Sequence, residues 1–101
     1  MIVRIWHASA SPQLAHLYTT HFNDAVLPRL RMLPGFRGAY LLHRSSNGEV
    51  EFVVQTLWDS MEAVKRFAGP EPGVAVVDED ARAVLTSFDT EVQHFDVIAS
   101  P

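Results

Sequence analysis

Histidine is the side chain best suited to acid–base chemistry in this chain, which holds five histidines and no cysteine. The lack of cysteine excludes a thiolate nucleophile, disulfides and cysteine-type zinc sites. Imidazole exchanges protons near neutral pH. His94 lies in a predicted strand, where it is a candidate general base or anion stabiliser facing a cavity. The alternative is a structural histidine, hydrogen-bonded to a neighbouring strand or to a second copy of the chain.

Trp58 is the candidate for holding a flat aromatic ligand, because it ends a predicted strand directly before a predicted helix. Its indole ring can stack on a ligand while its N–H donates to an oxygen, or it can simply fill the core. His7 ends the first predicted strand. We expect that strand to run parallel to the strand of Trp58 and antiparallel to the strand of His94, which would bring the three residues together. Three separate packing roles are the alternative.

Residues of the first predicted helix are candidates for the opposite wall of such a pocket. Tyr18, His21 and Phe22 lie there, and Tyr40 on the next strand is a further candidate ligand contact. Aromatic residues at helical spacing more often belong to the core. His16 and His21 are five residues apart and point to different faces of a helix, so the sequence predicts no metal site.

Strong local signals predict the elements that position these residues. Asn47-Gly48 between two apolar runs predicts a hairpin. Ser11 and Pro12 predict a helix start, and Pro28 should kink that helix. Asp59, with Glu62 three residues later, and Asp78 are expected helix N-caps. The expected strands are residues 2–8, 36–44, 49–58 and 91–98, and the expected helices are 11–32, 60–67 and 79–87.

This order is β-α-β-β-α-(α)-β, which predicts an α+β fold: a ferredoxin-like split βαβ arrangement with an antiparallel sheet and helices on one face. The uncovered sheet face should be polar in a monomer. However, the alternation of strands 36–44 and 49–58 places apolar residues on both faces. Phe36, Tyr40 and Leu42 share one face of the first strand, and Val53 and Leu57 share one face of the second. We therefore expect a homodimer packed through this face.

Composition excludes several classes of partner. The net charge of −4 and the scattered basic residues argue against nucleic acid, and no stretch is long and apolar enough for a membrane span. No secretory leader or phosphate-binding glycine loop is evident. We expect one domain, residues 1–101, in the cytoplasm.

The chain resembles the antibiotic biosynthesis monooxygenase superfamily over nearly its whole length. The resemblance is carried by residues 33–39 (LPGFRGA), by 56–69 (TLWDS, EA and FAG) and by 92–97 (VQHFDV). It implies a dimeric α+β barrel with a small apolar cavity between sheet and helices in each subunit. Fold likeness alone does not assign a reaction.

The quinone-forming members of that superfamily oxidise anthrone-type phenols with O₂ and use no flavin, metal or haem. The resemblance therefore implies a cofactor-independent monooxygenase acting on a small aromatic or phenolic compound. Trp58 matches the tryptophan that ends their third strand, whereas Val54 replaces their asparagine. The haem-degrading members use asparagine, tryptophan and histidine where this chain has His7, Phe67 and Val77, so we expect no haem degradation. The alternatives are a non-catalytic dimeric binding module and a cofactor-free cyclase or isomerase.

Overall fold

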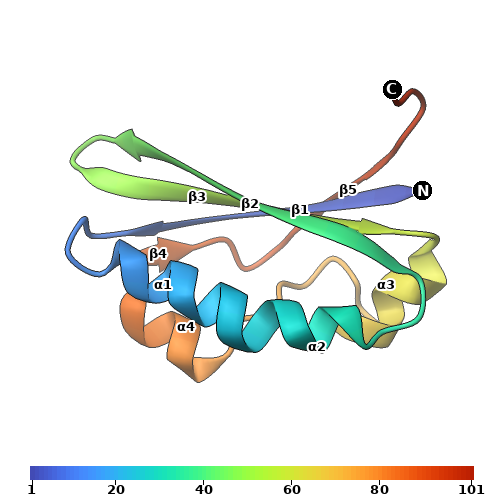
Figure 1. Cartoon of the computed structure of the whole chain (residues 1–101), viewed down its shortest axis with the longest axis horizontal. Helices are drawn as coiled ribbons and strands as arrows, with labels where there is room; N and C mark the ends of the chain where they lie inside the picture. Colours follow the sequence, from blue (N-terminus) through green and yellow to red (C-terminus); the bar gives the residue numbers. More distant parts are fainter.

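The computed structural model describes all 101 residues and arranges them in two layers, a sheet and a set of helices on one of its faces (Figure 1). In chain order the elements are β1 (Ile2–Ala10), α1 (Ala15–His21), a π-helical turn η1 (Phe22–Val26), α2 (Leu27–Arg31), β2 (Phe36–Ser46), β3 (Glu49–Trp58), α3 (Met61–Ala68), α4 (Glu79–Val84), β4 (Ser87–Phe88) and β5 (Gln93–Asp96). The predicted α+β class with an antiparallel sheet is confirmed. No helix is long and apolar enough to cross a membrane.

The sheet has the order β2-β3-β1-β4, with β5 also paired to β1, and every pairing is antiparallel. The expected parallel pairing of the first and third strands is therefore wrong. The hairpin at Asn47-Gly48 reverses the chain between β2 and β3, so β3 enters antiparallel to β1. Ile2, and not His7, lies opposite Trp58, while His7 lies opposite Val53.

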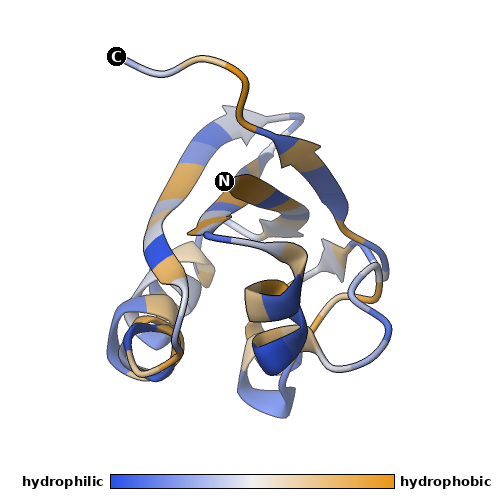
Figure 2. Cartoon of the chain, turned by 90° about the vertical axis from the view of Figure 1, so that its right-hand side faces the viewer, coloured by the Kyte–Doolittle hydropathy of each residue, from blue (hydrophilic) through white to orange (hydrophobic).

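Strand alternation gives the sheet a covered and an open face, as the alternating colours along the strands of Figure 2 illustrate. On β1, Arg4 and Ala8 are buried toward the helices. A β-bulge between Phe36 and Gly38 shifts the alternation of β2. Phe36 consequently packs against Trp58 on the covered face, whereas Tyr40 lies on the open face. The prediction that Phe36 and Tyr40 share a face is wrong for this reason.

The first helical segment begins later than predicted and contains a defect. Ser11 accepts from the backbone N–H groups of Leu14 and Ala15 through its carbonyl oxygen and is not the side-chain N-cap. The π-turn lets the Leu27 N–H bond to the Phe22 carbonyl oxygen, one residue further back than in an α-helix. This turn directly precedes Pro28, which has no N–H to donate, so the helix passes the proline without ending.

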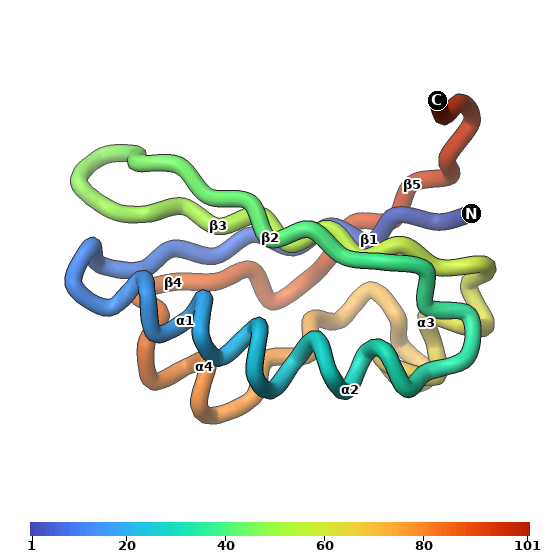
Figure 3. Tube along the Cα trace, viewed as in Figure 1, coloured from blue at the N-terminus to red at the C-terminus, as the bar shows by residue number.

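The later helices begin at side-chain caps. Ser60, and not Asp59, caps α3 by accepting from the Ala63 N–H at 3.2 Å. Asp59 forms an ion pair with Arg37 instead. The predicted cap Asp78 is confirmed, since its carboxylate accepts from the Ala81 N–H at 2.9 Å. The predicted strand 91–98 is shortened to β5, and the remaining tail leaves the sheet on the side opposite the helices (Figure 3).

The core between sheet and helices divides into two clusters. One surrounds Tyr18, Phe22 and Phe52, and the other contains Leu30, Trp58, Ala63 and Val64. At the second cluster the backbone of Gly35 approaches α3 closely. A Cβ atom on Gly35 would lie 2.5 Å from the Cβ of Ala63, and Gly35 has φ +87°, so only glycine suits this position.

Candidate functional site

A mostly apolar cavity of about 60 Å³ lies between the sheet and the helical layer. β1 and β3 supply its ceiling, α1, η1 and α2 supply one wall, and the segment before α4 supplies the other. The apolar lining residues include Trp6, Phe22, Val54, Phe67, Val76 and Val92. The space holds only a few water molecules, at roughly 10–15 Å³ each. A fused-ring ligand therefore enters only if side chains at the mouth rearrange.

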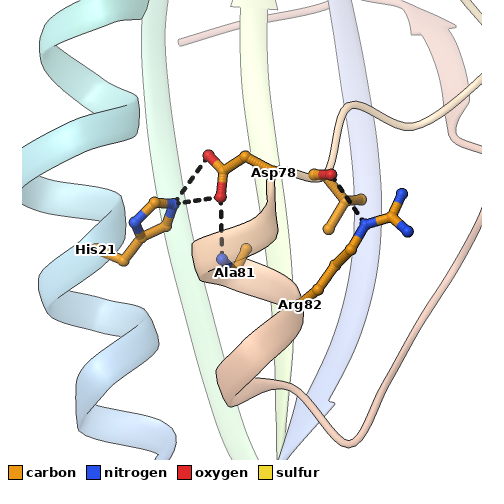
Figure 4. A network of polar contacts seen from close by, with 5 residues as sticks. His21, Asp78, Ala81 and Arg82 are labelled. Carbon is orange, nitrogen blue, oxygen red and sulfur yellow. Dashed lines mark hydrogen bonds and ion pairs between the residues drawn. The ribbon is translucent and has the colours of Figure 1, made fainter.

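One polar group in this cavity is a histidine–carboxylate pair. His21 Nε2 lies 3.1 Å from the carboxylate oxygens of Asp78, and both residues line the cavity. Figure 4 shows the Asp78 carboxylate between the imidazole from α1 and the Ala81 N–H from α4. Asp78 thus serves as helix cap and as partner of the imidazole. A carboxylate that accepts the N–H of a neutral imidazole fixes the orientation of the ring, and the other ring nitrogen can then accept a proton.

Arg4 is the second polar group, and it is only 5% exposed. Its guanidinium donates to the carbonyl oxygen of Pro72 and, at 3.1 Å, to that of Val74. Nη1 also lies 3.2 Å from Nε2 of His94, which can accept a hydrogen bond only when the imidazole is neutral. Burial lowers the pKa of Arg4 to about 10, so the group stays charged at neutral pH. Burial and the nearby Arg4 charge lower the pKa of His94, which favours the neutral imidazole.

Tyr18 supplies a phenol to the same cavity and packs against Phe52, with ring centroids 5.0 Å apart. Burial, and then the charge of Asp78, raise the pKa of Tyr18 above its ordinary value. The hydroxyl therefore remains protonated and is available as a hydrogen-bond donor.

Comparisons with known proteins locate this architecture among solved structures. No protein-family model and no curated protein sequence matches the chain. A Bacillus cereus protein assigned provisionally to the antibiotic biosynthesis monooxygenases superimposes with a TM-score of 0.66 at 17% identity, over 99% of this chain and 95% of that one. The heme-degrader MhuD from Mycobacterium tuberculosis, with two hemes bound in its active site, gives 0.63 at 26% identity, over 100% and 99%.

A third similar structure is a monooxygenase from the ActVA-Orf6 gene of Streptomyces coelicolor, in complex with the ligand nanaomycin D. Its TM-score is 0.61 at 17% identity, and the match covers 98% of this chain and 92% of that one. This chain has the fold of the antibiotic biosynthesis monooxygenases. The resemblance seen in the sequence is therefore confirmed for the fold.

Within this monooxygenase fold, the structure brings only some of the predicted site residues to the cavity. Tyr18, His21 and Phe22 line it. Trp58 does not: it is 0% exposed, and its Nε1 donates to Thr56 Oγ1 at 2.9 Å. Trp58 stacks on Phe67, with centroids 5.8 Å apart, and thus lies behind the cavity wall.

The remaining predicted residues lie outside the cavity. His94 lies opposite Arg4 and contacts the cavity only through it. His7 lies on the open sheet face of β1, opposite to the face of Arg4, and its Nδ1 is 3.6 Å from a carboxylate oxygen of Asp89. Tyr40 is 61% exposed on the open sheet face. The antiparallel register separates His7 from Trp58, so the expected His7–His94–Trp58 constellation does not form.

Sequence reasoning missed Arg4 and gave Asp78 only a capping role. A signal for Arg4 was present: it occupies the covered-face position of a strand whose neighbours on that face, Trp6 and Ala8, are apolar. A charged residue at such a position requires a buried partner or a ligand. Asp78 offered no comparable signal, since its pairing with His21 joins residues 57 positions apart. No three side chains of the metal-ligating types come together.

Proposed function

We propose that the protein is a cofactor-independent monooxygenase that oxidises a small aromatic or phenolic compound with O₂. The observation that carries the proposal is the meeting, in one apolar cavity, of a proton acceptor and a buried cation. The acceptor is the His21–Asp78 pair, and the cation is Arg4. Removing a proton from a phenol or an activated CH₂ group creates an anion, and a buried cation stabilises that anion. The likeness to monooxygenases of the same fold supports this chemistry.

The proposed reaction converts an anthrone-type CH₂ group into a carbonyl. The His21–Asp78 pair takes a proton, and the resulting carbanion, in resonance with the ring oxygen, transfers electrons to O₂. A C–O bond forms, the proton returns to give a hydroperoxide, and loss of water leaves the carbonyl. One oxygen atom of O₂ ends in the product and the other in water. All four electrons that reduce O₂ come from the substrate.

The other cavity residues would bind and orient this substrate. Phe22 and Trp6 offer flat apolar contacts, and the protonated Tyr18 hydroxyl can donate to a ring oxygen. We assign His94 a positioning role, because it holds Arg4 and does not line the cavity. Trp58 does not line the cavity; it stacks on Phe67 and donates a hydrogen bond to Thr56, two residues that do.

The decisive experiment measures O₂ consumption and product mass with anthrone-type and hydroquinone substrates, without added cofactor. His21→Gln should lower the rate by about 10²–10⁴-fold, the usual contribution of a general base. Asp78→Asn should also lower it, while asparagine keeps the helix cap. His16→Gln is the matched control, because His16 is exposed on the same helix and does not line the cavity. Oxidation that is equally fast in His21→Gln and wild type would refute the assigned roles.

A cofactor-free cyclase or isomerase is the second candidate, because the same proton acceptor and cation serve an enolate without O₂. This candidate predicts a product with the same mass as the substrate, formed under argon as fast as in air. His21→Gln should abolish its formation. A non-catalytic module would instead bind panel compounds and release them unchanged.

We also propose that the protein is a homodimer, folded as one domain and acting in the cytoplasm. The open sheet face carries exposed apolar residues, among them Tyr40, Leu42 and Phe95. Leu42→Glu should convert the dimer to a monomer in light scattering after size-exclusion chromatography. Leu17→Glu is the control, since Leu17 is similarly exposed at 41%, against 44% for Leu42, but lies on α1. A wild-type protein that is monomeric at all concentrations would refute this assembly.

A further inference from the structure

Arg4 is a buried cation without a carboxylate partner. The ion pairs of the chain join His7, His21, Arg37 and Arg44 to acidic residues, and none includes Arg4. Its partners are two carbonyl oxygens and a neutral imidazole. Burying a guanidinium without an opposite charge is costly, so the missing anion is a feature that needs an explanation.

The guanidinium also retains unused donors. It carries five N–H groups, of which three point to Pro72, Val74 and His94. The Nε–H and one N–H of Nη2 remain, and these are on adjacent nitrogens of a group that lines the cavity. Adjacent guanidinium N–H groups are suited to binding both oxygens of a carboxylate.

A second cation reinforces the positive charge at this end of the cavity. The guanidinium carbons of Arg4 and Arg29 each lie 5.7 Å from the ring centroid of Phe67, and both arginines line the cavity. Arg29 forms no ion pair. The single carboxylate in the lining, Asp78, is paired with His21. This positive end belongs to a chain whose net charge is −4, so it is a local arrangement and not a consequence of composition.

We propose that the cavity selects aromatic carboxylic acids, with Arg4 binding the carboxylate and the apolar walls holding the ring. Arg4 is thus the residue that determines substrate class, and Arg29 adds long-range attraction. The inference rests on the proposed function in treating the ligand as substrate, and both proposals use the charge of Arg4. The binding site itself depends only on the geometry of Arg4 and requires no reaction. The carbonyl oxygens of Pro72 and Val74 and the neutral His94 hold the guanidinium in place.

The test compares acids with neutral amides of the same shape. Binding of benzoate and 2-naphthoate is measured by calorimetry beside benzamide and 2-naphthamide. Wild type should bind each acid at least tenfold more tightly than its amide. In Arg4→Gln, which removes the guanidinium and keeps a polar amide, this preference should disappear. Arg29→Gln should reduce it partly. Arg37→Gln should leave it unchanged, because Arg37 is exposed, pairs with Asp59 and does not line the cavity.

Either of two results would overturn the inference: equal or undetectable binding of acids and amides by wild type, or an undiminished preference in a folded Arg4→Gln protein. If Arg4→Gln does not fold, the wild-type comparison and Arg29→Gln still decide. The outcome is separate from that of the oxygenase proposal. Tight binding of acids without O₂ uptake would uphold the carboxylate site and refute the oxygenase reaction. Oxidation of neutral phenols with no preference for acids would uphold the reaction and refute the carboxylate site.

Discussion

Replacing Trp58 by phenylalanine separates the two roles that the sequence left open for this residue. Because Trp58 is fully buried behind the cavity wall, we expect Trp58→Phe to reduce stability and leave ligand affinity nearly unchanged. The substitution removes two buried ring carbons, at about 0.8 kcal/mol each. It also removes the hydrogen bond to Thr56, worth about 1 kcal/mol. The free energy of unfolding should therefore fall by about 2.5 kcal/mol.

The assay is urea unfolding and thermal melting at one fixed protein concentration, since dimerisation would make stability depend on concentration. A domain of this size loses roughly 4–8 °C in Tm per kcal/mol, so the melting temperature should drop by about 10–20 °C. Trp6→Phe is the matched control. Trp6 is only partly buried and lines the cavity, and its Nε1 donates to the Asp89 carbonyl oxygen at 2.7 Å near the surface. It should cost less stability than Trp58→Phe and should weaken 2-naphthoate binding more.

The reverse pattern would refute this reasoning. If Trp58→Phe kept the stability of wild type while 2-naphthoate affinity fell further than in Trp6→Phe, Trp58 would contact the ligand directly. The cavity would then have to extend behind Phe67, where Trp58 stacks on that ring.

Two further predictions concern the backbone and the pH dependence of stability. Gly35→Ala should lower the free energy of unfolding by about 2–5 kcal/mol, since it adds a clash with Ala63 to the strain of a positive φ. Gly48→Ala, at φ +79° with open space around it, should cost only about 1–2 kcal/mol; equal urea midpoints would contradict the assigned clash. The pKa of His94 is lowered in the folded state, so the unfolded chain binds more protons and stability should fall as pH drops from about 6.5 through that pKa. His94→Gln should remove this part of the pH dependence in urea titrations, and an identical pH profile in both proteins would show that the pKa of His94 is not lowered by folding.

Local signals determined most of the elements of this fold. Asn47 and Gly48 adopt φ values of 51° and 79°, as the predicted hairpin turn requires. Strand β3 has the predicted bounds, and Asp78 caps its helix. The short-range chemistry of turns and caps specifies such features almost independently of the rest of the chain. The cap of α3 is an instructive failure: Ser60 and Asp59 were both suitable, and the distant Arg37 engaged Asp59.

The candidate site depended on information that local patterns do not carry. Tyr18, His21 and Phe22 could be predicted as a group because helical spacing puts them near one another. The pairing of His21 with Asp78 and of Arg4 with the Pro72–Val74 backbone joins residues separated by 57 or more positions. The bulge at Phe36 and Gly38 moved Tyr40 to the open face, because one extra residue reverses the alternation of a strand.

The sequence by itself determined the element order, the turns and an apolar interior in two layers, because these follow from periodicity and from the backbone preferences of single residues. Only the tertiary structure decided which polar side chains share the cavity. The antiparallel register of β1 with β3 removed His7 from Trp58 and placed Arg4 opposite Thr56 on the cavity side. Register arises from the packing of the whole sheet against the helices, and a shift of one residue would exchange the two faces.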